Sequence, residues 1–495
     1  MAIDTIRNER LGKLEKLREA GMEPYPARTS RTHEIGEFLE QHAALESAGT
    51  LVTIAGRVMS IREHGGSLFV DLFDGTEKTQ GYIQKDVLGE KEFDFFQEVV
   101  DSGDIIELTG TAFTTKRGMP SLKGEGWHML AKALLPIPDE WYGLKDEDER
   151  YRKRYLDILL SRDLAERIRR RSKFWNTIRA YLLERDFVEV ETPVLETMTG
   201  GADARPFVTH HHALDIDTYL RISAGELWQK RLMVAGLPKV FEIGRIFRNE
   251  GMSAEHLQDY TQMEFYEAFK DYQVGMGMVK ELYCKIAQEV YGTLQFEIRG
   301  HKVDLSDEWQ TYNFAELIED RFGLNPITEL YTKTGERVTL ENLQEVCSAA
   351  GIEYEHAGLN IARTVDNLWK VLRKELSGPG FLVGVPVYME PLAKRAEDGK
   401  TVERFQVIIA GSEVGKGYSE LNDPVDQRQR FEEQQAMRDA GDEEAQMADI
   451  EFVEALEYGM PPALGFGVSE RLFGFLEGVS AREAQIFPLM RPRGK

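Results

Sequence analysis

Cysteines, long apolar runs and low-complexity tracts are scarce or missing in this sequence. Only two cysteines, Cys284 and Cys347, occur among 495 residues. No disulfide framework is therefore expected, and both thiols are predicted to be buried and reduced. No stretch of about 18 apolar residues is present, so no membrane-spanning helix is expected. The first residues contain no apolar segment typical of a secretory signal. These absences predict a cytoplasmic protein that does not cross a membrane.

Positive charge is also scarce. The chain carries 61 Lys and Arg against 85 Asp and Glu, which gives a formal net charge of −24. This balance alone disfavours a nucleic-acid partner, although a local basic patch can serve one on an acidic protein. One basic run stands out at residues 150–173. We interpret most of it as a solvated helix face or as ion pairs between subunits.

The residue pattern changes along the chain and predicts a division into domains. Residues 1–48 are expected to form an N-terminal helical segment, because leucines recur at helical spacing within it. Residues 49–138 alternate apolar and polar side chains, as strands do. A proline-containing linker is expected at residues 139–150, after Pro136-Ile137-Pro138. Residues 151–495 mix helical and strand patterns and are predicted to form a second domain.

The strand-rich region has the element order of an OB-fold barrel. Five strands are expected at residues 51–59, 67–74, 81–84, 104–110 and 128–134, with one helix at about 89–100. OB-folds often bind oligonucleotides through aromatic side chains on an exposed sheet face. Phe69 and Tyr82 are the candidates for stacking on anticodon bases, and Arg57 and Lys85 are the candidates for phosphate contacts. Packing of either aromatic inside the barrel remains the alternative.

The chemically richest stretch is a predicted hairpin at residues 240–268. Arg248 and Glu250, two residues apart, are expected on one face of its first strand. Glu264 and Tyr266 alternate onto one face of the returning strand, and a loop with His256 connects the two. A fixed cation, carboxylates, an imidazole and aromatic rings on one surface suit a nucleoside triphosphate beside a small cationic substrate.

Several strings in the sequence resemble those of one enzyme family. Phe247-Arg248-Asn249-Glu250 and the returning strand resemble motif 2 of the class II aminoacyl-tRNA synthetases. A predicted helix at 163–185, with Asp163 as its N-cap, and a strand ending at Pro193 resemble motif 1, at about 165–194. Residues 463–480 resemble motif 3, because they contain a Gly-rich string that ends at Arg471. The string Gly200-Gly201-Ala202-Asp203-Ala204-Arg205-Pro206-Phe207 is similar to a signature of the lysyl-tRNA synthetases.

This resemblance implies an α+β fold. An N-terminal OB-fold β-barrel that binds the anticodon would be followed by a class II catalytic domain, whose mostly antiparallel sheet is flanked by helices. Residues 305–380 would be a helical insertion. The implied activity is ATP-dependent ligation of L-lysine to tRNA(Lys) through a lysyl-adenylate, with Mg²⁺ as the metal ion of ATP. Motif 1 implies a homodimer.

The resemblance also implies roles at the nucleotide end of the site. Arg248 and Arg471 would be the catalytic residues, because guanidinium groups neutralise phosphate charge. Arg248 would contact the α-phosphate and the substrate carboxylate, and Arg471 would cover adenine and clamp the γ-phosphate. The remaining ATP contacts would be Glu250, His256, Tyr260 and Glu413. Glu413 and Glu420 would hold Mg²⁺, which prefers oxygen ligands.

The implied lysine pocket is rich in carboxylates. Its residues would be Gly201, Glu226, Arg248, Glu264, Tyr266, Lys416, Tyr418 and Glu420. The alternative role for Glu226 is an ion pair with Lys230, four residues on. Lys416 stands where the family usually has Asn. A cation beside a lysine site costs affinity unless it faces phosphate or pairs with an acid such as Glu264.

Two other functions are open to a chain of this kind. A synthetase paralogue could adenylate a lysine-like amino acid for another acceptor, but an anticodon-reading barrel would serve no purpose there. A non-catalytic protein derived from a synthetase could keep the fold alone. The presence of Arg248, Glu413, Glu420 and Arg471 argues against that second alternative.

Overall fold

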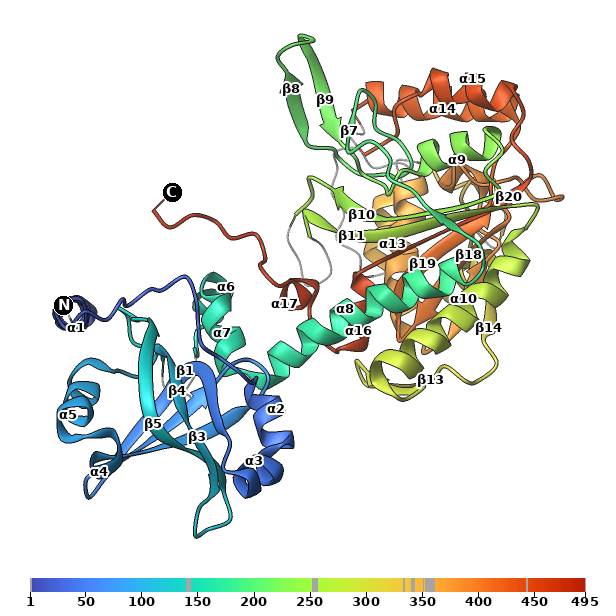
Figure 1. Cartoon of the computed structure of the whole chain (residues 1–495). Helices are drawn as coiled ribbons and strands as arrows, with labels where there is room; N and C mark the ends of the chain where they lie inside the picture. Colours follow the sequence, from blue (N-terminus) through green and yellow to red (C-terminus); the bar gives the residue numbers. More distant parts are fainter. Residues whose placement is uncertain are drawn as a thin grey trace. The chain divides into compact units, whose positions relative to one another are not determined.

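The computed structural model describes residues 2–138, 144–251, 257–332, 334–339, 343–349, 351, 361–441 and 444–494. The chain forms two compact units, Met1–Leu160 and Ser161–Lys495 (Figure 1). Each unit has its own buried apolar core. Within the described ranges, no helix is both long enough and apolar enough to cross a membrane.

In the first unit, strands close into a barrel in the order β1-β2-β3-β5-β4. The strands are β1 Leu51–His64, β2 Ser67–Phe73, β3 Lys78–Gln84, β4 Ile105–Thr114 and β5 Pro120–Ala131. The helices are α1 Ala2–Glu19, α2 Ile35–Glu40, α3 His42–Ala48, α4 Lys85–Leu88, α5 Glu90–Val99, α6 Glu147–Arg152 and α7 Arg154–Leu160. The closed barrel, with α4 and α5 between its third and fourth strands in sequence, confirms the predicted OB-fold.

Alternation of side chains explains how the barrel forms. On β2, Leu68, Val70 and Leu72 are buried inside, while their neighbours lie half-buried on the outer face. The last strand was wrongly predicted at 128–134, because it begins at Pro120. Its first half has glycines in place of apolar side chains. Gly124 packs against Leu108, so the alternation that marks a strand is hidden in the sequence.

The second unit contains an eight-stranded sheet in its described part, in the order β14-β17-β18-β19-β20-β11-β10-β6. Its strands are β6 Val188–Glu189, β10 Lys239–Phe247, β11 Asp259–Ala268, β14 Gln310–Asn313, β17 Gly380–Val383, β18 Arg404–Ile409, β19 Ser412–Ser419 and β20 Ala463–Ser469. Only the two edge pairs, β14–β17 and β10–β6, are parallel among these described strands. The mostly antiparallel sheet confirms the predicted fold class.

Helices and short strands surround this sheet. The helices are α8 Arg162–Leu183, α9 Glu226–Val234, α10 Tyr272–Ile286, α11 Phe314–Phe322, α12 Leu343–Ala349, α13 Ile361–Leu372, α14 Pro424–Asp439, α15 Ile450–Glu457, α16 Arg471–Leu476 and α17 Ala481–Ala484, with single turns at Ala287–Tyr291, Arg373–Glu375 and Val387–Met389. The smaller sheets are built from β7 Leu195–Glu196, β8 Val208–His211, β9 Ile216–Leu220, β12 Gln295–Ile298, β13 His301–Asp304, β15 Leu324–Asn325 and β16 Tyr331–Thr332.

The two faces of the main sheet are covered by different helices, as Figure 1 shows. Neighbouring residues on a strand point to opposite faces, so Phe241 and Phe265 join one core with α8 and α10. Val240 and Tyr266 join the other core with α9, α13, α14 and α15. The strands at the centre of this sheet are therefore held from both faces by apolar packing.

Two expectations for this unit need correction. Helix α8 has Ser161 as its N-cap, not Asp163, because the Ser161 hydroxyl accepts a hydrogen bond from the Leu164 N–H. Residues 305–380 are not helical throughout, because their ends form strands β14 and β17 of the main sheet. Strand β14 escaped notice because it lies at the sheet edge, where a polar sequence without apolar alternation is tolerated.

Candidate active site

A cavity of about 320 Å³ opens above strands β11, β19 and β20. All predicted site residues of the second unit line it except Glu250 and His256. His256 lies outside the described residues. Glu250 follows the end of β10, and its backbone N–H bonds to the Arg248 carbonyl in a tight turn. The expectation that Arg248 and Glu250 share one strand face is therefore wrong, because β10 ends at Phe247.

Glycines on β20 make room for the side chains of its two neighbouring strands. Gly467 lies between Glu264 on β11 and Lys416 on β19 in the strand register. A Cβ atom on Gly465 would lie 1.8 Å from Glu420 Oε1 and 2.7 Å from the Tyr266 ring. The cavity floor is thus bare backbone, and any larger residue at position 465 would fill the space that Glu420 occupies.

One end of the cavity is acidic and buried. The Lys230 ammonium, fully buried, donates to Glu226 at 2.8 Å and forms an ion pair with Glu420 at 2.5 Å. Tyr418 donates its hydroxyl hydrogen to Glu226. Oε1 of Glu420 accepts no hydrogen bond from any described residue. A buried carboxylate oxygen without a donor is an acceptor site for a ligand. The alternative role of Glu226, pairing with Lys230, is observed.

Glu264 completes the acidic end. It accepts hydrogen bonds from the Ala224 N–H at 2.8 Å, Gln262 at 2.7 Å and the Tyr266 hydroxyl at 3.1 Å. Burial and the neighbouring Glu226 raise the pKa of Glu264 to about 7. Burial, opposed by the Lys230 ammonium, raises the pKa of Glu420 to about 8. Protons shared among these carboxylates at neutral pH would leave when a cation binds.

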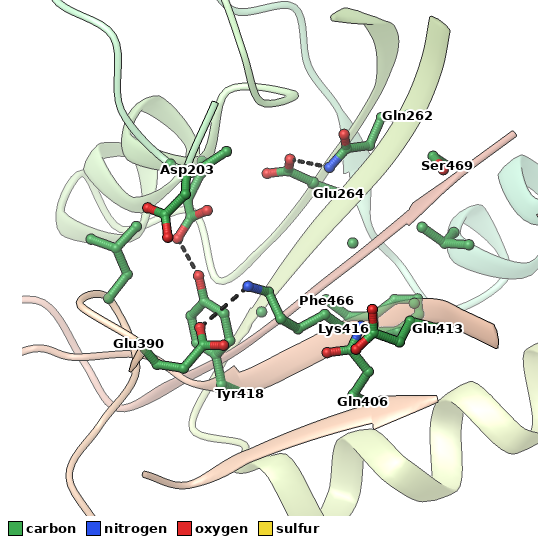
Figure 2. A pocket seen from close by; sticks show the side chains of 18 of the residues that line it. Asp203, Gln262, Glu264, Glu390, Gln406, Glu413, Lys416, Tyr418, Phe466 and Ser469 are labelled. Atoms are coloured by element: carbon green, nitrogen blue, oxygen red, sulfur yellow. Dashed lines mark hydrogen bonds and ion pairs between the residues drawn. The ribbon is translucent and has the colours of Figure 1, made fainter. Parts of the chain in front are cut away.

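The opposite wall carries positive charge. Lys416 lies 3.2 Å from Glu390 Oε2, and Arg404 lies 2.6 Å from Glu390 Oε1. The two cations hold the pKa of Glu390 below its usual value despite burial. Figure 2 shows Lys416 extended toward Glu390, with Gln406 and Glu413 beside it. Lys416 therefore pairs with a pocket acid as one expectation had it, but the acid is Glu390 and not Glu264.

Arg248 reaches the cavity from the turn after β10. Its Nε donates to the Ile222 carbonyl at 3.2 Å, and its guanidinium lies 5.9 Å from the centre of the Tyr260 ring. Its backbone N–H bonds to the Gln258 carbonyl at 2.8 Å and closes the hairpin. The guanidinium is thereby held over the cavity between an aromatic ring and the β9–α9 connection.

Arg471 begins helix α16 at the far side of the cavity, directly after Glu470. The Glu470 carboxylate accepts hydrogen bonds from Arg171 on α8 and from Gln485. The Glu470 N–H bonds to the Thr261 carbonyl of β11 at 2.9 Å. Arg471 is therefore placed by a residue that connects the three regions resembling motifs 1, 2 and 3.

The predicted carboxylate pair borders one cavity. Glu413 and Glu420 lie at the two ends of β19, whose pairing with β18 is interrupted by a bulge between them, and both residues line the cavity. Glu420 is ion-paired with Lys230, and Glu413 accepts a hydrogen bond from Trp369 Nε1 at 2.7 Å. Among the described residues, no group of three or more His, Cys, Asp or Glu side chains could hold a metal ion.

The barrel presents an aromatic surface of its own. Phe69 and Tyr82 pair across β2 and β3 with ring centres 4.9 Å apart, and Phe113 lies 5.5 Å from Tyr82. Phe69 and Tyr82 are half-buried on the outer face, so they do not pack inside the barrel. Arg57 donates to the Gly103 carbonyl at 2.7 Å. Lys85 pairs with Glu90 and Asp94.

These pairings weaken the two predicted phosphate contacts on the barrel. Both cations already have partners within the same unit, so a phosphate would have to displace a carbonyl or carboxylate oxygen. The basic run at 150–173 behaves in a similar way. Arg167 and Arg170 pair with Glu477 of the same chain, and Arg171 pairs with Glu470. These are ion pairs within one chain and not between subunits.

Several site residues were missed from the sequence, namely Lys230, Gln262, Glu390 and Arg404. Lys230 had a local signal, its i,i+4 spacing from Glu226, but its partner Glu420 lies far along the chain. Glu390 and Arg404 had no signal at all, because their pairing depends on how a loop folds back onto β18. Gln262 did have a sequence signal: it lies two residues before Glu264 on β11, and such residues share one face of a strand.

Known proteins share both units of this chain. The family model of class II tRNA synthetases (D, K and N) matches residues 146–491, and that of the OB-fold nucleic acid binding domain matches residues 52–130. A lysine–tRNA ligase of Roseiflexus sp. (strain RS-1) is 43% identical over the full length of both chains. That of Thermotoga sp. (strain RQ2) is 40% identical, over 99% of this chain and 96% of its own length. That of Nostoc punctiforme is 40% identical, over 100% of this chain and 89% of its own.

Proposed function

Because the chain belongs to the lysine–tRNA ligase family of class II synthetases, we propose that it attaches L-lysine to tRNA(Lys) in two steps. In the first, the lysine carboxylate attacks the α-phosphorus of ATP and releases pyrophosphate, which leaves lysyl-adenylate on the enzyme. In the second, the 3′-terminal adenosine of the tRNA takes the lysyl group and AMP departs. Neither step needs a covalent bond to the protein, so the side chains position reactants and neutralise charge.

The single observation that carries this proposal is the buried acidic end of the cavity. Glu226 and Glu420 share one buried ammonium, Lys230, while Glu264 beside them accepts hydrogen bonds from uncharged donors only, so the cluster has more carboxylates than cations. Oε1 of Glu420 has no donor among the described residues. The side-chain ammonium of lysine supplies both the missing charge and the missing donors. Tyr266 and Tyr418 line the same end and would cover the aliphatic stem. Gly201 would let the substrate approach the backbone.

The nucleotide is proposed to bind between Arg248 and Arg471. Arg248 would neutralise the α-phosphate as the pentacoordinate transition state forms, while Arg471 would contact the γ-phosphate side. Tyr260, half-buried and beside Arg248, offers a ring for stacking on adenine. Glu413 lines the same cavity. His256 and Glu250 remain predicted contacts of the nucleotide without a structural argument.

The metal ion is proposed to be Mg²⁺, entering as its complex with ATP. That ion keeps several waters and binds phosphate oxygens readily. Glu413 and Glu420, which line the same cavity, are the carboxylates proposed to hold it. No step of the reaction is assigned to a protein-held metal.

Two partners follow from surfaces outside the cavity. The barrel is proposed to bind the anticodon through Phe69 and Tyr82, because paired rings on an outer face offer a stacking platform. A homodimer is proposed to form around the region that resembles motif 1. Leu183, Val188, Val194 and Leu195 are each at least 42% exposed there, which is unusual for apolar residues so close in sequence. We propose that the enzyme acts in the cytoplasm, where aminoacylated tRNA is used in protein synthesis.

The test is ATP–pyrophosphate exchange with each of the twenty amino acids in the presence of Mg²⁺. Exchange with lysine alone is expected, followed by lysine transfer to tRNA(Lys). Exchange with another amino acid would overturn the assignment of the acidic end. Exchange with lysine but no transfer to tRNA would favour another acceptor. An enzyme inactive with all twenty would be a non-catalytic relative of the family.

A further inference from the structure

The β9–α9 connection, residues 221–225, contacts two proposed site residues through its backbone. The Ile222 carbonyl accepts the hydrogen bond that Arg248 Nε donates at 3.2 Å. The Ala224 N–H donates to the Glu264 carboxylate at 2.8 Å. This connection therefore fixes both a guanidinium group proposed to contact phosphate and a carboxylate proposed to contact the lysine ammonium.

The Arg221 side chain anchors the connection at a site that is almost closed to solvent. Its guanidinium forms an ion pair with the Glu242 carboxylate, and the two side chains are 3% and 5% exposed. Its Nε donates to the Arg245 carbonyl at 2.8 Å, and its Nη1 donates to the Thr192 hydroxyl at 3.3 Å. The anchor thus joins the connection to strand β10 and to the residue that precedes Pro193.

Both carboxylate oxygens of Glu242 have donors in this arrangement. The oxygen that does not pair with Arg221 accepts hydrogen bonds from the Thr192 N–H at 3.0 Å and from the Thr192 hydroxyl at 2.6 Å. Glu242 lies directly opposite Glu264 in the β10–β11 register, so the two carboxylates point to the same face of the sheet. Arg221 therefore neutralises the acid next to Glu264 and leaves Glu264 for a ligand.

Two glycines leave the space that the anchor occupies. A Cβ atom on Gly244 of β10 would overlap the Arg221 guanidinium. Gly225, the N-cap of α9, has a φ of +78°, and a Cβ atom there would overlap the Thr192 hydroxyl. The backbone around the ion pair is therefore close-packed, and the Arg221 side chain has little freedom to move.

We propose that Arg221 is a positioning residue, whose ion pair with Glu242 holds the β9–α9 connection so that Arg248 and Glu264 keep their places. This inference rests on the proposed function and deepens it, because it names the group that aligns a phosphate contact with an ammonium contact. Arg221 acts through the backbone of its own segment and does not touch the substrates.

Loss of the anchor should affect kcat and the two KM values differently. Without a fixed carbonyl at Ile222, Arg248 would not be aligned when charge develops at the α-phosphate, so kcat falls. Without the Ala224 N–H, Glu264 keeps only its side-chain donors, so lysine binds more weakly. The KM for ATP should change little, because the contribution of Arg248 is proposed for the transition state.

The test uses a double variant, because Arg221→Met alone leaves Glu242 as an unpaired buried anion. Arg221→Met with Glu242→Gln removes both charges and keeps an acceptor for Thr192. Its thermal unfolding should resemble that of wild type. In ATP–pyrophosphate exchange, its kcat is expected to fall about 30-fold and its KM for lysine to rise about fivefold. Arg221→Lys keeps the ion pair without the planar fork and should recover part of kcat.

The matched control removes another largely buried ion pair of the same unit. Arg231 pairs with Asp449, the N-cap of α15, at 2.9 Å, with side chains 19% and 13% exposed. Arg231→Met with Asp449→Asn should leave kcat and both KM values within about twofold of wild type. Wild-type constants in the Arg221 double variant would mean that its ion pair only stabilises the fold, and the proposal would be wrong. Equal losses in the control would overturn it as well.

Amide hydrogen exchange of the substrate-free enzyme separates this proposal from the proposed function. The Arg221 N–H bonds to the Val194 carbonyl at 3.0 Å, and the Arg221 carbonyl accepts from the Phe247 N–H at 2.9 Å. The Arg221 double variant should speed exchange at residues 221–224 and leave α10 unchanged. Failure of the wild-type enzyme to use lysine would remove the proposed function and leave this measurement interpretable. Unchanged protection of residues 221–224 in the double variant would remove the role of Arg221 alone.

Discussion

The two ends of the catalytic cavity are built in different ways. At the acidic end, Lys230 is completely buried and is held by two carboxylates from different elements. At the opposite wall, Lys416 is nearly half exposed, forms an ion pair with Glu390 and also faces the Asp203 carboxylate. The acidic end is therefore a buried ion network, whereas the Lys416–Glu390 contact is a partly exposed ion pair. Under the proposed function, the amino acid would bind at the rigid, buried end and the charged nucleotide at the more exposed one.

The difference has an energetic reason. A buried charge cluster must have nearly complete pairing, because an unpaired buried charge costs several kcal/mol. Such a cluster rejects a neutral ligand of the same shape, which would leave carboxylates unpaired. An exposed ammonium carries little penalty when empty and is screened by salt. We therefore expect the acidic end to govern which amino acid binds, and any contribution of Lys416 to affinity to depend on ionic strength.

The largest effect is expected from Arg248→Ala, because Arg248 lines the cavity beside Tyr260 and is the proposed contact of the α-phosphate. It should reduce lysine-dependent exchange about 1000-fold, which corresponds to about 4 kcal/mol of transition-state stabilisation. The measurement is kcat/KM in ATP–pyrophosphate exchange, with Arg248→Lys as the variant that keeps the charge but loses the planar fork. Wild-type activity in Arg248→Ala would mean that the chemistry lies elsewhere.

Lys230→Met should break the acidic end through stability and not through chemistry alone. It leaves Glu226 and Glu420 buried without their cation, and we expect a loss of about 3 kcal/mol in the free energy of unfolding. Urea unfolding monitored by tryptophan fluorescence measures it. The double variant Lys230→Met with Glu226→Gln should recover part of the loss. If Lys230→Met is as stable as wild type, the cluster is not the buried ion network described above.

The pH dependence of the two KM values, for lysine and for ATP, should differ between the two ends of the cavity. Glu264 and Glu420 have pKa values raised to about 7 and about 8, mainly by burial, so both hold protons in the free enzyme at pH 6.5. Binding of an ammonium group favours the ionised forms. The KM for lysine should therefore fall about 10-fold between pH 6.5 and pH 8.5, while the KM for ATP changes little. A KM for lysine that is flat over this range would contradict the shared-proton description.

The same shifts act on folding with the opposite sign. A carboxyl group whose folded pKa exceeds its unfolded value stabilises the fold while protonated, and this contribution is lost as pH rises through the folded pKa. The free enzyme should thus lose stability from Glu264 and Glu420 between about pH 5 and pH 8. Saturating lysine should reduce that loss, which thermal unfolding with and without lysine can measure.

The smallest effect is expected on the barrel, which serves as a third region for comparison. Tyr82→Ala removes one ring of the Phe69–Tyr82–Phe113 surface and should raise the KM for tRNA about fivefold, or about 1 kcal/mol of stacking. Lysine-dependent exchange without tRNA should be unchanged. Tyr82→Phe is the matched control and should behave as wild type. A change in exchange by Tyr82→Ala would mean that the variant disturbs more than tRNA binding.

The sequence was sufficient where function and local pattern coincide. The motif-like strings around Arg248, Glu264, Glu420 and Arg471 converge on one cavity because each string sits on a strand or at its end, and the strands are neighbours in one sheet. The barrel was predictable because alternating apolar residues mark most of its strands. Periodicity therefore located the elements, and the motifs identified which of them meet.

The sequence could not predict which charged side chains pair when the partners lie far apart along the chain. Lys416 meets Glu390 and not Glu264, because the loop before β18 folds back over the cavity. Arg57 and Lys85 are basic and near the aromatic face, but intramolecular oxygens already occupy them. Charge type is visible in a sequence, whereas charge pairing is not.

The bare floor at Gly465 limits how this gene can vary. Every amino acid other than glycine carries a Cβ atom, and at this position that atom would overlap the Glu420 carboxylate. All missense changes of this codon are therefore expected to be null alleles for lysine use, even conservative ones such as alanine. In a mutational scan under selection for growth, position 465 should tolerate only synonymous change. The absence of a side chain at Gly465 is thus expected to be a requirement for lysine use.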